Sequence, residues 1–288
     1  MLRRIAIALM LMLPCSASAQ ERFSIFVPTD QDDVPRMLKL AGLKDGDVVY
    51  DLGSGDGRIV LEAARLNPTV RGRGIEIDDK LVLESRRQVA AHGLADRVDI
   101  VHQNAFDADL GQATVISMWL WPEVMRMLRP KIMDEARPGT RVVTRLWDLG
   151  TWKPDAEDTN QPRLFMWVVP ARLAGYWEWD LAVGNATHRY SALVEQRFQE
   201  VEGVARAGQR RGVLDGMKLV GDELSFSLMM TLPGVGLVRH RFSGRVQGDV
   251  IEGRVSLQRE PDDPAIELPW RAERATRSAY HAPTGMTP

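Results

Sequence analysis

The chain has 288 residues, with 37 basic and 39 acidic side chains and a formal net charge of −2. This length allows two modest hydrophobic cores. Because acidic and basic side chains are interspersed, the composition implies no basic surface for binding nucleic acid, and we expect no nucleic-acid partner.

The first 19 residues differ from everything after them. Residues 1–4 are basic, residues 5–13 are apolar, and residues 17–19 form an A-x-A cleavage pattern. The apolar stretch is shorter than the roughly 20 residues of a membrane-spanning helix. We therefore expect a signal peptide over 1–19 and an exported, periplasmic protein, cleaved after Ala19, with no transmembrane segment left. An uncleaved anchor and lipidation at Cys15 are the alternatives.

Cys15 is the only cysteine and lies inside the expected signal peptide. After cleavage the chain would contain no thiol. That would exclude disulfides, cysteine nucleophiles and cysteine-based zinc sites. We expect no metal site.

Helical and strand-like patterns alternate from residue 33 onward. The pattern predicts a short helix over 33–41 with Asp33 as its cap, a strand over 48–52 and a helix from Arg58 to Asn67. It then predicts strands over 72–77, 98–101, 114–118 and 141–146, with helices over 78–92 and 122–137. Alternating strands and helices predict a Rossmann-like parallel sheet with helices on both faces.

The pattern changes after residue 147. Residues 152–162 look like a polar crossing, and short alternating strands separated by glycine turns follow. They predict an all-β domain over 165–276, an antiparallel β-meander folded as a sandwich or small barrel, and then a disordered tail over 277–288. Alternating aromatic residues are expected to form its core, although a barrel lined with aromatics can also hold a ligand. They are Trp177, Trp179, Phe198, Phe226, Phe242 and Trp270.

The most informative segment begins at Asp51, where a buried strand runs into three glycines at alternate positions, Gly53, Gly55 and Gly57. Such glycines let the backbone approach a ligand closely. A dinucleotide fingerprint is the main competitor, but position 58 lacks its third glycine, and Asp51 would repel a pyrophosphate. The carboxylate suits a ligand that carries an ammonium and a sulfonium group. A sharp strand-to-helix turn with no ligand is the simpler alternative.

Glu76 is the second informative residue. It lies at the end of the predicted strand over 72–77, about 25 residues after Asp51. This is near the spacing of the acidic residue in nucleotide-binding βαβ units, where a carboxylate accepts both ribose hydroxyls. The alternative is a solvated acid on a loop.

The D-x-G-x-G-x-G pattern from Asp51 to Gly57 resembles the first motif of class I S-adenosylmethionine-dependent methyltransferases. Further segments resemble the family that contains the protein N-lysine methyltransferase of the ATP synthase c-subunit, together with its bacterial relatives. The resemblance covers residues 28–155 and implies a domain that binds S-adenosylmethionine there. The segments that carry it are Pro28-Thr29, Met37 to Ala41, Asp47 to Val60, Gly74 to Asp78, Leu120 to Val124 and Leu128 to Pro130.

The resemblance also implies roles for two residues beyond the glycine turn. Asn104 would accept a hydrogen bond from the adenine amino group through its carbonyl oxygen, unless it is only a turn residue. Trp119 would flank the sulfonium by cation–π attraction, unless it only packs. The expected cofactor-binding residues are therefore Asp51, Gly53, Ser54, Gly55, Gly57, Glu76, Asn104 and Trp119. No catalytic residue is identified, although His102 lies near a motif.

These observations predict an exported S-adenosylmethionine-dependent methyltransferase whose partner is a protein substrate. The methyl group would pass to an amino group, that of lysine, by in-line displacement. A non-catalytic protein on the same scaffold, whose β-domain contacts an envelope ligand, is the alternative. An aminopropyl transferase is disfavoured because the segment after the fourth strand, residues 117–124, has no carboxylate cluster for a polyamine.

Overall fold

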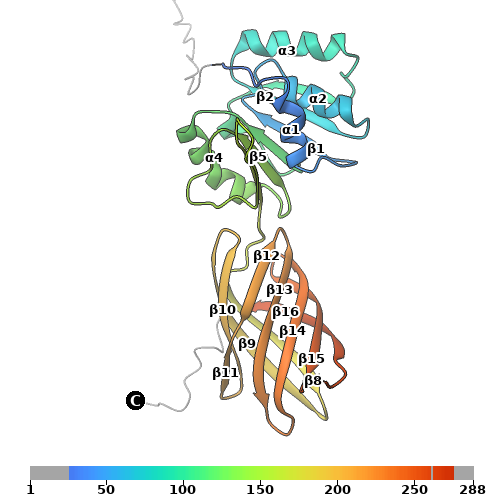
Figure 1. The fold of residues 1–288 in the computed structure, drawn as a ribbon, viewed down its shortest axis with the longest axis vertical. Coiled ribbons are helices and arrows are strands. Elements are labelled where there is room, and N and C mark those ends of the chain that lie inside the picture. The colour runs from blue at the N-terminus through green and yellow to red at the C-terminus, as the bar shows by residue number, and fades with distance from the viewer. Residues whose placement is uncertain (1–25, 261, 276–288) are drawn as a thin grey trace, which may run out of the picture.

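The structure is a computed structural model that describes residues 26–260 and 262–275. It contains two β-sheets, one flanked by helices and one curled nearly into a barrel (Figure 1). The predicted signal peptide and the tail over 277–288 lie outside the described residues. Within the described residues, no helix combines the length and apolar character needed to cross a bilayer.

The first sheet, sheet A, has seven strands in the order β3-β2-β1-β4-β5-β7-β6. Its first five strands are parallel, as predicted, and the strand order reverses between β1 and β4. These strands are β1 (Val48–Leu52), β2 (Arg71–Glu76), β3 (Val98–His102), β4 (Val115–Met118) and β5 (Arg141–Arg145). The helices are α1 (Asp33–Leu40), α2 (Arg58–Leu66), α3 (Asp79–Ala91), η1 (Ala105–Asp107) and α4 (Pro122–Glu135).

Alternation along the strands divides the core of sheet A between its two faces. Val49 packs with α1, α2 and α3 on one face, while the adjacent Tyr50 packs with α4 on the other. This arrangement confirms the predicted parallel sheet with helices on both faces. The helix starts differ in detail. Asp78 caps α3 by accepting from Lys80 N, whereas α1 begins at Asp33 itself, after Asp32, so Asp33 is not the cap.

Two strands that complete sheet A were not predicted there. The region over 152–162, expected as a polar crossing, contains β6 (Ala156–Asp158). It is followed by β7 (Leu164–Val168), which pairs antiparallel with β5. The predicted domain boundary at residue 165 is therefore too early. β7 is apolar throughout and lies directly before the region of short strands, and sequence alone does not show which sheet such a strand joins.

Sheet B is antiparallel and has nine strands in the order β11-β10-β9-β8-β16-β15-β14-β13-β12. The two strands of this sheet that come first and last in the chain, β8 and β16, pair with each other in the middle of this order. The sheet curls nearly into a barrel, and its two edges are β11 and β12 (Figure 1). This confirms the predicted antiparallel meander in its small-barrel form. The strands are β8 (Gly175–Val183), β9 (Ala186–Arg197), β10 (Glu200–Ala207), β11 (Arg210–Val213), β12 (Asp215–Val220), β13 (Glu223–Leu232), β14 (Gly236–Gln247), β15 (Val250–Gln258) and β16 (Ile266–Ala275).

Five of the six aromatic residues expected in the β-domain core lie there, and Phe198 does not. Phe198 sits in the turn between β9 and β10 with a positive φ of 57°. Its ring stacks on Trp152 of the first domain at a centroid distance of 5.8 Å, and the Arg129 guanidinium lies 5.3 Å from its centroid. Phe198 therefore joins the two domains, a contact that strand alternation does not reveal.

We expect Phe198→Ala to lower the free energy of unfolding by about 1–3 kcal/mol because it removes half-buried apolar surface between the domains. It should also separate one thermal unfolding transition into two, measured by scanning calorimetry. Phe226→Ala is the control, because Phe226 is buried wholly within sheet B. If Phe198→Ala leaves the transition unchanged, the aromatic contact does not couple the domains.

Candidate functional site

A cavity of about 420 Å³ opens at the carboxyl ends of β1, β2 and β4, where the strand order of sheet A reverses. In open α/β sheets this is the position where ligands bind. The cavity is large enough for a nucleoside-sized ligand. Of the expected cofactor residues, six line it: Asp51, Gly53, Ser54, Glu76, Asn104 and Trp119.

The glycine turn after β1 is shaped by close neighbours. Gly53 has a φ of 79°, and a Cβ atom there would lie 2.5 Å from Leu120 Cδ2. Gly55 has a φ of 54°, and its Cβ would lie 2.2 Å from Phe26 Cε2. The positive φ strains any side chain at either position, and a Cβ there would also require Leu120 or Phe26 to move.

Gly55 and Gly57 shape this turn but do not line the cavity. Gly57 is the N-cap residue of α2, with a φ of 81°. A Cβ on it would lie 3.2 Å from the Cβ of Ser85 on α3, behind the turn. Their expected part in binding the cofactor is thus an indirect one, through the shape of the backbone.

Glu76 ends β2 and is 7% exposed. Its Oε2 accepts from Gly55 N at 2.8 Å, while Oε1 accepts from Ile77 N at 2.8 Å and Asp78 N at 2.9 Å. Three backbone donors hold the carboxylate at the cavity wall and fix the glycine turn to the end of β2. The alternative of a solvated loop acid is wrong.

Asp51 is buried at the end of β1, and Ser117 Oγ of β4 donates to its Oδ1 at 2.7 Å. Burial raises the pKa of Asp51 to about 7, with a smaller contribution from the nearby Glu76, while the Ser117 hydrogen bond opposes the rise. A cation in the cavity would favour the ionised form. The site therefore holds a carboxyl group whose charge responds to what the cavity contains.

Asn104 follows β3 and caps η1. Its Oδ1 accepts from Phe106 N at 3.0 Å, so the turn interpretation describes its contact within the chain. Asn104 nevertheless lines the cavity beside Gln103 and Phe106. A carbonyl oxygen has two lone pairs, so the expected contact with an adenine amino group remains a prediction.

Trp119 follows β4 and lines the cavity. The guanidinium of Arg145 lies 4.3 Å from its ring centroid, so the cation that the structure places on this indole belongs to the chain itself. A contact with a sulfonium would use the other face of the ring. Trp121 also lines the cavity and is 48% exposed.

The N-terminal segment 26–29 forms a wall of the cavity that sequence reasoning did not assign. Thr29 is buried, and its carbonyl oxygen accepts from Arg58 Nη1, while Arg58 pairs with Asp56. Both Asp56 and Arg58 line the cavity as well. One signal in the sequence could have indicated this wall, because Pro28-Thr29 is among the segments that carry the family resemblance.

Two further expectations concern histidine and metals. His102 does not line the cavity, and its Nε2 lies 3.1 Å from Ile77 O and 3.2 Å from Asp79 Oδ1. Within residues 26–260 and 262–275, no group of His, Cys, Asp and Glu side chains is arranged to hold a metal ion.

The donors around the cavity fit S-adenosylmethionine. Glu76 offers carboxylate oxygens for ribose hydroxyls, and Asp51 offers a carboxylate for an ammonium group. Gly53 brings its backbone to the cavity wall without a side chain, and Ser54 Oγ is a buried hydroxyl with no protein partner. Aromatic side chains of Phe106, Trp119 and Trp121 supply apolar walls.

Comparison with known proteins agrees with this geometry. The family model of the ANTKMT methyltransferase domain matches residues 51–156. The protein-lysine N-methyltransferase of Saccharolobus islandicus is 40% identical over 149 residues, which cover 50% of this chain and 92% of that protein. The adenine nucleotide translocase lysine N-methyltransferase of Mus musculus is 33% identical and matches 46% of this chain. The chain spans only 56% of the length of that mouse relative.

A solved structure shares the first domain. It is described as an RNA methyltransferase from Salinibacter ruber in complex with S-adenosyl-L-homocysteine, and it is 43% identical with a TM-score of 0.50. The match covers 51% of this chain and 96% of that one. The similarity therefore accounts for about half of the chain.

Proposed function

The chain belongs to the family of S-adenosylmethionine-dependent methyltransferases that includes the protein-lysine N-methyltransferase of Saccharolobus islandicus, and we propose that it methylates a lysine side chain of a protein. S-adenosylmethionine is its cofactor. One observation carries the proposal for the site: the cavity at the strand-order reversal brings together Asp51, Glu76 and the glycine turn.

Glu76 would hold the ribose hydroxyls, because its carboxylate is already fixed at the wall by three backbone donors. Asp51 would pair with the ammonium group of the methionine part, with its orientation fixed by Ser117. Gln103, Asn104 and Phe106 would surround the base.

S-adenosylmethionine, when bound, supplies a methyl group on a positively charged sulfur. The chain's contribution is to position the acceptor and to exclude water. Trp119, Leu120 and Trp121 form the wall after β4 and lie where a neutral acceptor amine would enter. We assign no general base, so the acceptor lysine is taken to lose its proton to solvent before it enters.

We further propose that residues 1–19 direct export to the periplasm and are removed after Ala19. The supporting observation is the order of a basic segment, an apolar segment and an A-x-A pattern. Mass spectrometry of the protein from a periplasmic fraction tests it. A chain beginning at Gln20 is expected, whereas an intact Met1 in the cytoplasmic fraction contradicts export.

The acceptor is tested by incubating the protein with isotopically labelled S-adenosylmethionine and cell extract. We expect label that protease releases and nuclease does not, and methyl-lysine in the labelled peptides by mass spectrometry. Glu76→Ala is the inactive control. Label that nuclease alone removes would contradict a protein acceptor and would favour the activity named for the Salinibacter ruber relative.

A further inference from the structure

Arg145 occupies an unusual position at the end of β5. Its side chain is 9% exposed, its Nε lies 2.8 Å from Asp33 Oδ2, and its Nη2 lies 2.7 Å from Asp30 Oδ2. The same guanidinium lies 4.3 Å from the ring centroid of Trp119. One buried cation thus contacts two carboxylates from the segment before and at the start of α1 and an indole from the segment after β4.

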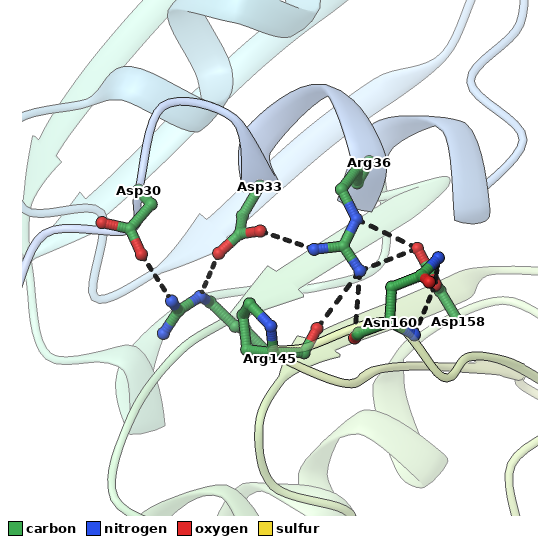
Figure 2. A network of polar contacts seen from close by, with 7 residues as sticks. Asp30, Asp33, Arg36, Arg145, Asp158 and Asn160 are labelled. Carbon is green, nitrogen blue, oxygen red and sulfur yellow. Dashed lines mark hydrogen bonds and ion pairs between the residues drawn. The ribbon is translucent and has the colours of Figure 1, made fainter.

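The ion pairs continue beyond Arg145. Asp33 also accepts from Arg36, which reaches Asp158 of β6 at 2.9 Å and the carbonyl oxygen of Asn160 at 3.2 Å. Figure 2 shows Arg145 between Asp30 and Asp33, with Arg36 on the other side of Asp33. Burying an arginine is unfavourable unless it is paired, and the two carboxylates offset that cost for Arg145.

The position of Arg145 relative to the cavity suggests which parts of the site this residue holds in place. Trp119 lines the cavity, whereas Arg145 and Asp30 do not, so the guanidinium lies behind the indole. Asp30 directly follows the N-terminal segment 26–29, which forms another part of the wall. Arg145 therefore links the wall after β4 to the wall formed by the N-terminal segment.

We infer that Arg145 is a positioning residue for methyl transfer. It holds the indole of Trp119 at the wall where the acceptor enters, and through Asp30 and Asp33 it holds the N-terminal segment against the cavity. This role rests on the proposed function, because it assumes that the cavity is the site of transfer. Arg145 acts through Trp119 and Asp30 and touches neither the cofactor nor the acceptor.

A purely structural role for Arg145 makes a different prediction. Arg141 lies on the same strand, at the other end of β5, and forms a comparable ion pair with Asp47 at 2.5 Å, with its side chain 13% exposed. It contacts no residue of the cavity wall that it could orient. Arg141→Met is therefore a matched control that removes a paired arginine from the same strand.

The test uses protein labelled with 5-fluorotryptophan and needs no acceptor. The Trp119 resonance is assigned by its loss in Trp119→Phe and is followed by fluorine NMR without ligand. We expect Arg145→Met to move or broaden this resonance, Arg145→Lys to give an intermediate position, and Arg141→Met to leave it unchanged. An unchanged resonance in Arg145→Met, or an equal change in Arg141→Met, would overturn the inference.

Kinetics provide the second readout. Arg145→Met should lower kcat/KM for methyl transfer by at least about tenfold. In the double variant with Trp119→Phe, the fold loss of kcat/KM should be much smaller than the product of the two single fold losses. Asp30→Asn, which removes the charge of an exposed carboxylate, should weaken S-adenosylhomocysteine binding while the Trp119 resonance stays in place. If the fold loss in the double variant equals the product of the two single losses, Arg145 does not act through Trp119. If the wild-type protein transfers no methyl group to protein, the proposed function fails, but the NMR result still decides the positioning role.

Discussion

Replacing Glu76 with alanine is expected to weaken the binding of S-adenosylhomocysteine at least about 100-fold, or roughly 2.7 kcal/mol. The change removes the proposed acceptor for the ribose hydroxyls. It also leaves the backbone N–H groups of Gly55, Ile77 and Asp78 without the partner that fixes the glycine turn. Calorimetric titration measures the affinity, and circular dichroism checks that the variant is folded.

Two variants make this result specific. Glu76→Gln keeps the shape and one acceptor oxygen, so an intermediate loss is expected. Glu62→Ala removes an acid of α2 that pairs with Arg65 and does not line the cavity, and it should leave the affinity unchanged. Equal affinities in wild type and Glu76→Ala would show that Glu76 does not hold the ligand.

The affinity for S-adenosylhomocysteine should rise about tenfold between pH 6 and pH 8 because of Asp51. The pKa of its carboxyl group is raised to about 7, chiefly by burial, so the group is mostly protonated at pH 6 and mostly ionised at pH 8. The ammonium group of the ligand pairs only with the ionised form. Asp51→Asn should bind weakly with little dependence on pH, and calorimetry at several pH values measures both proteins.

The same titration has the opposite effect on stability without ligand. The folded-state pKa of Asp51 lies above the ordinary value of 3.8, so the folded state holds this proton more tightly than the unfolded state does. The stabilisation is fully present below about pH 4 and is lost as the pH rises through about 7, with an upper limit of roughly 4 kcal/mol. In Asp51→Asn this part of the pH dependence should disappear. An identical pH profile in both proteins would contradict the raised pKa.

Local sequence patterns predicted the elements around the site well. The buried run Val48–Leu52 forms β1 as expected, and the glycines that follow it take the positive φ angles that their pattern requires. Glu76 lies at the end of β2 because an apolar strand leads into it. These features depend on residues adjacent in the chain, which is why sequence was sufficient.

The remaining features depend on residues that are distant in the chain. Strand β7 joins sheet A through its pairing with β5, and Phe198 reaches Trp152 across the two domains. Arg145 meets Asp30 and Asp33 more than one hundred residues earlier. No local pattern indicates such contacts, because an arginine that ends a strand looks the same whether it meets solvent or two carboxylates.

The measurement that tests the central claim most directly is a crystal structure of the protein with S-adenosylhomocysteine. The account predicts that the ligand occupies the cavity at the strand-order reversal. Its ribose hydroxyls should lie within hydrogen-bonding distance of the Glu76 carboxylate, and its ammonium group should face Asp51. A ligand bound elsewhere, on sheet B for example, or an empty cavity at saturating ligand, would contradict the account.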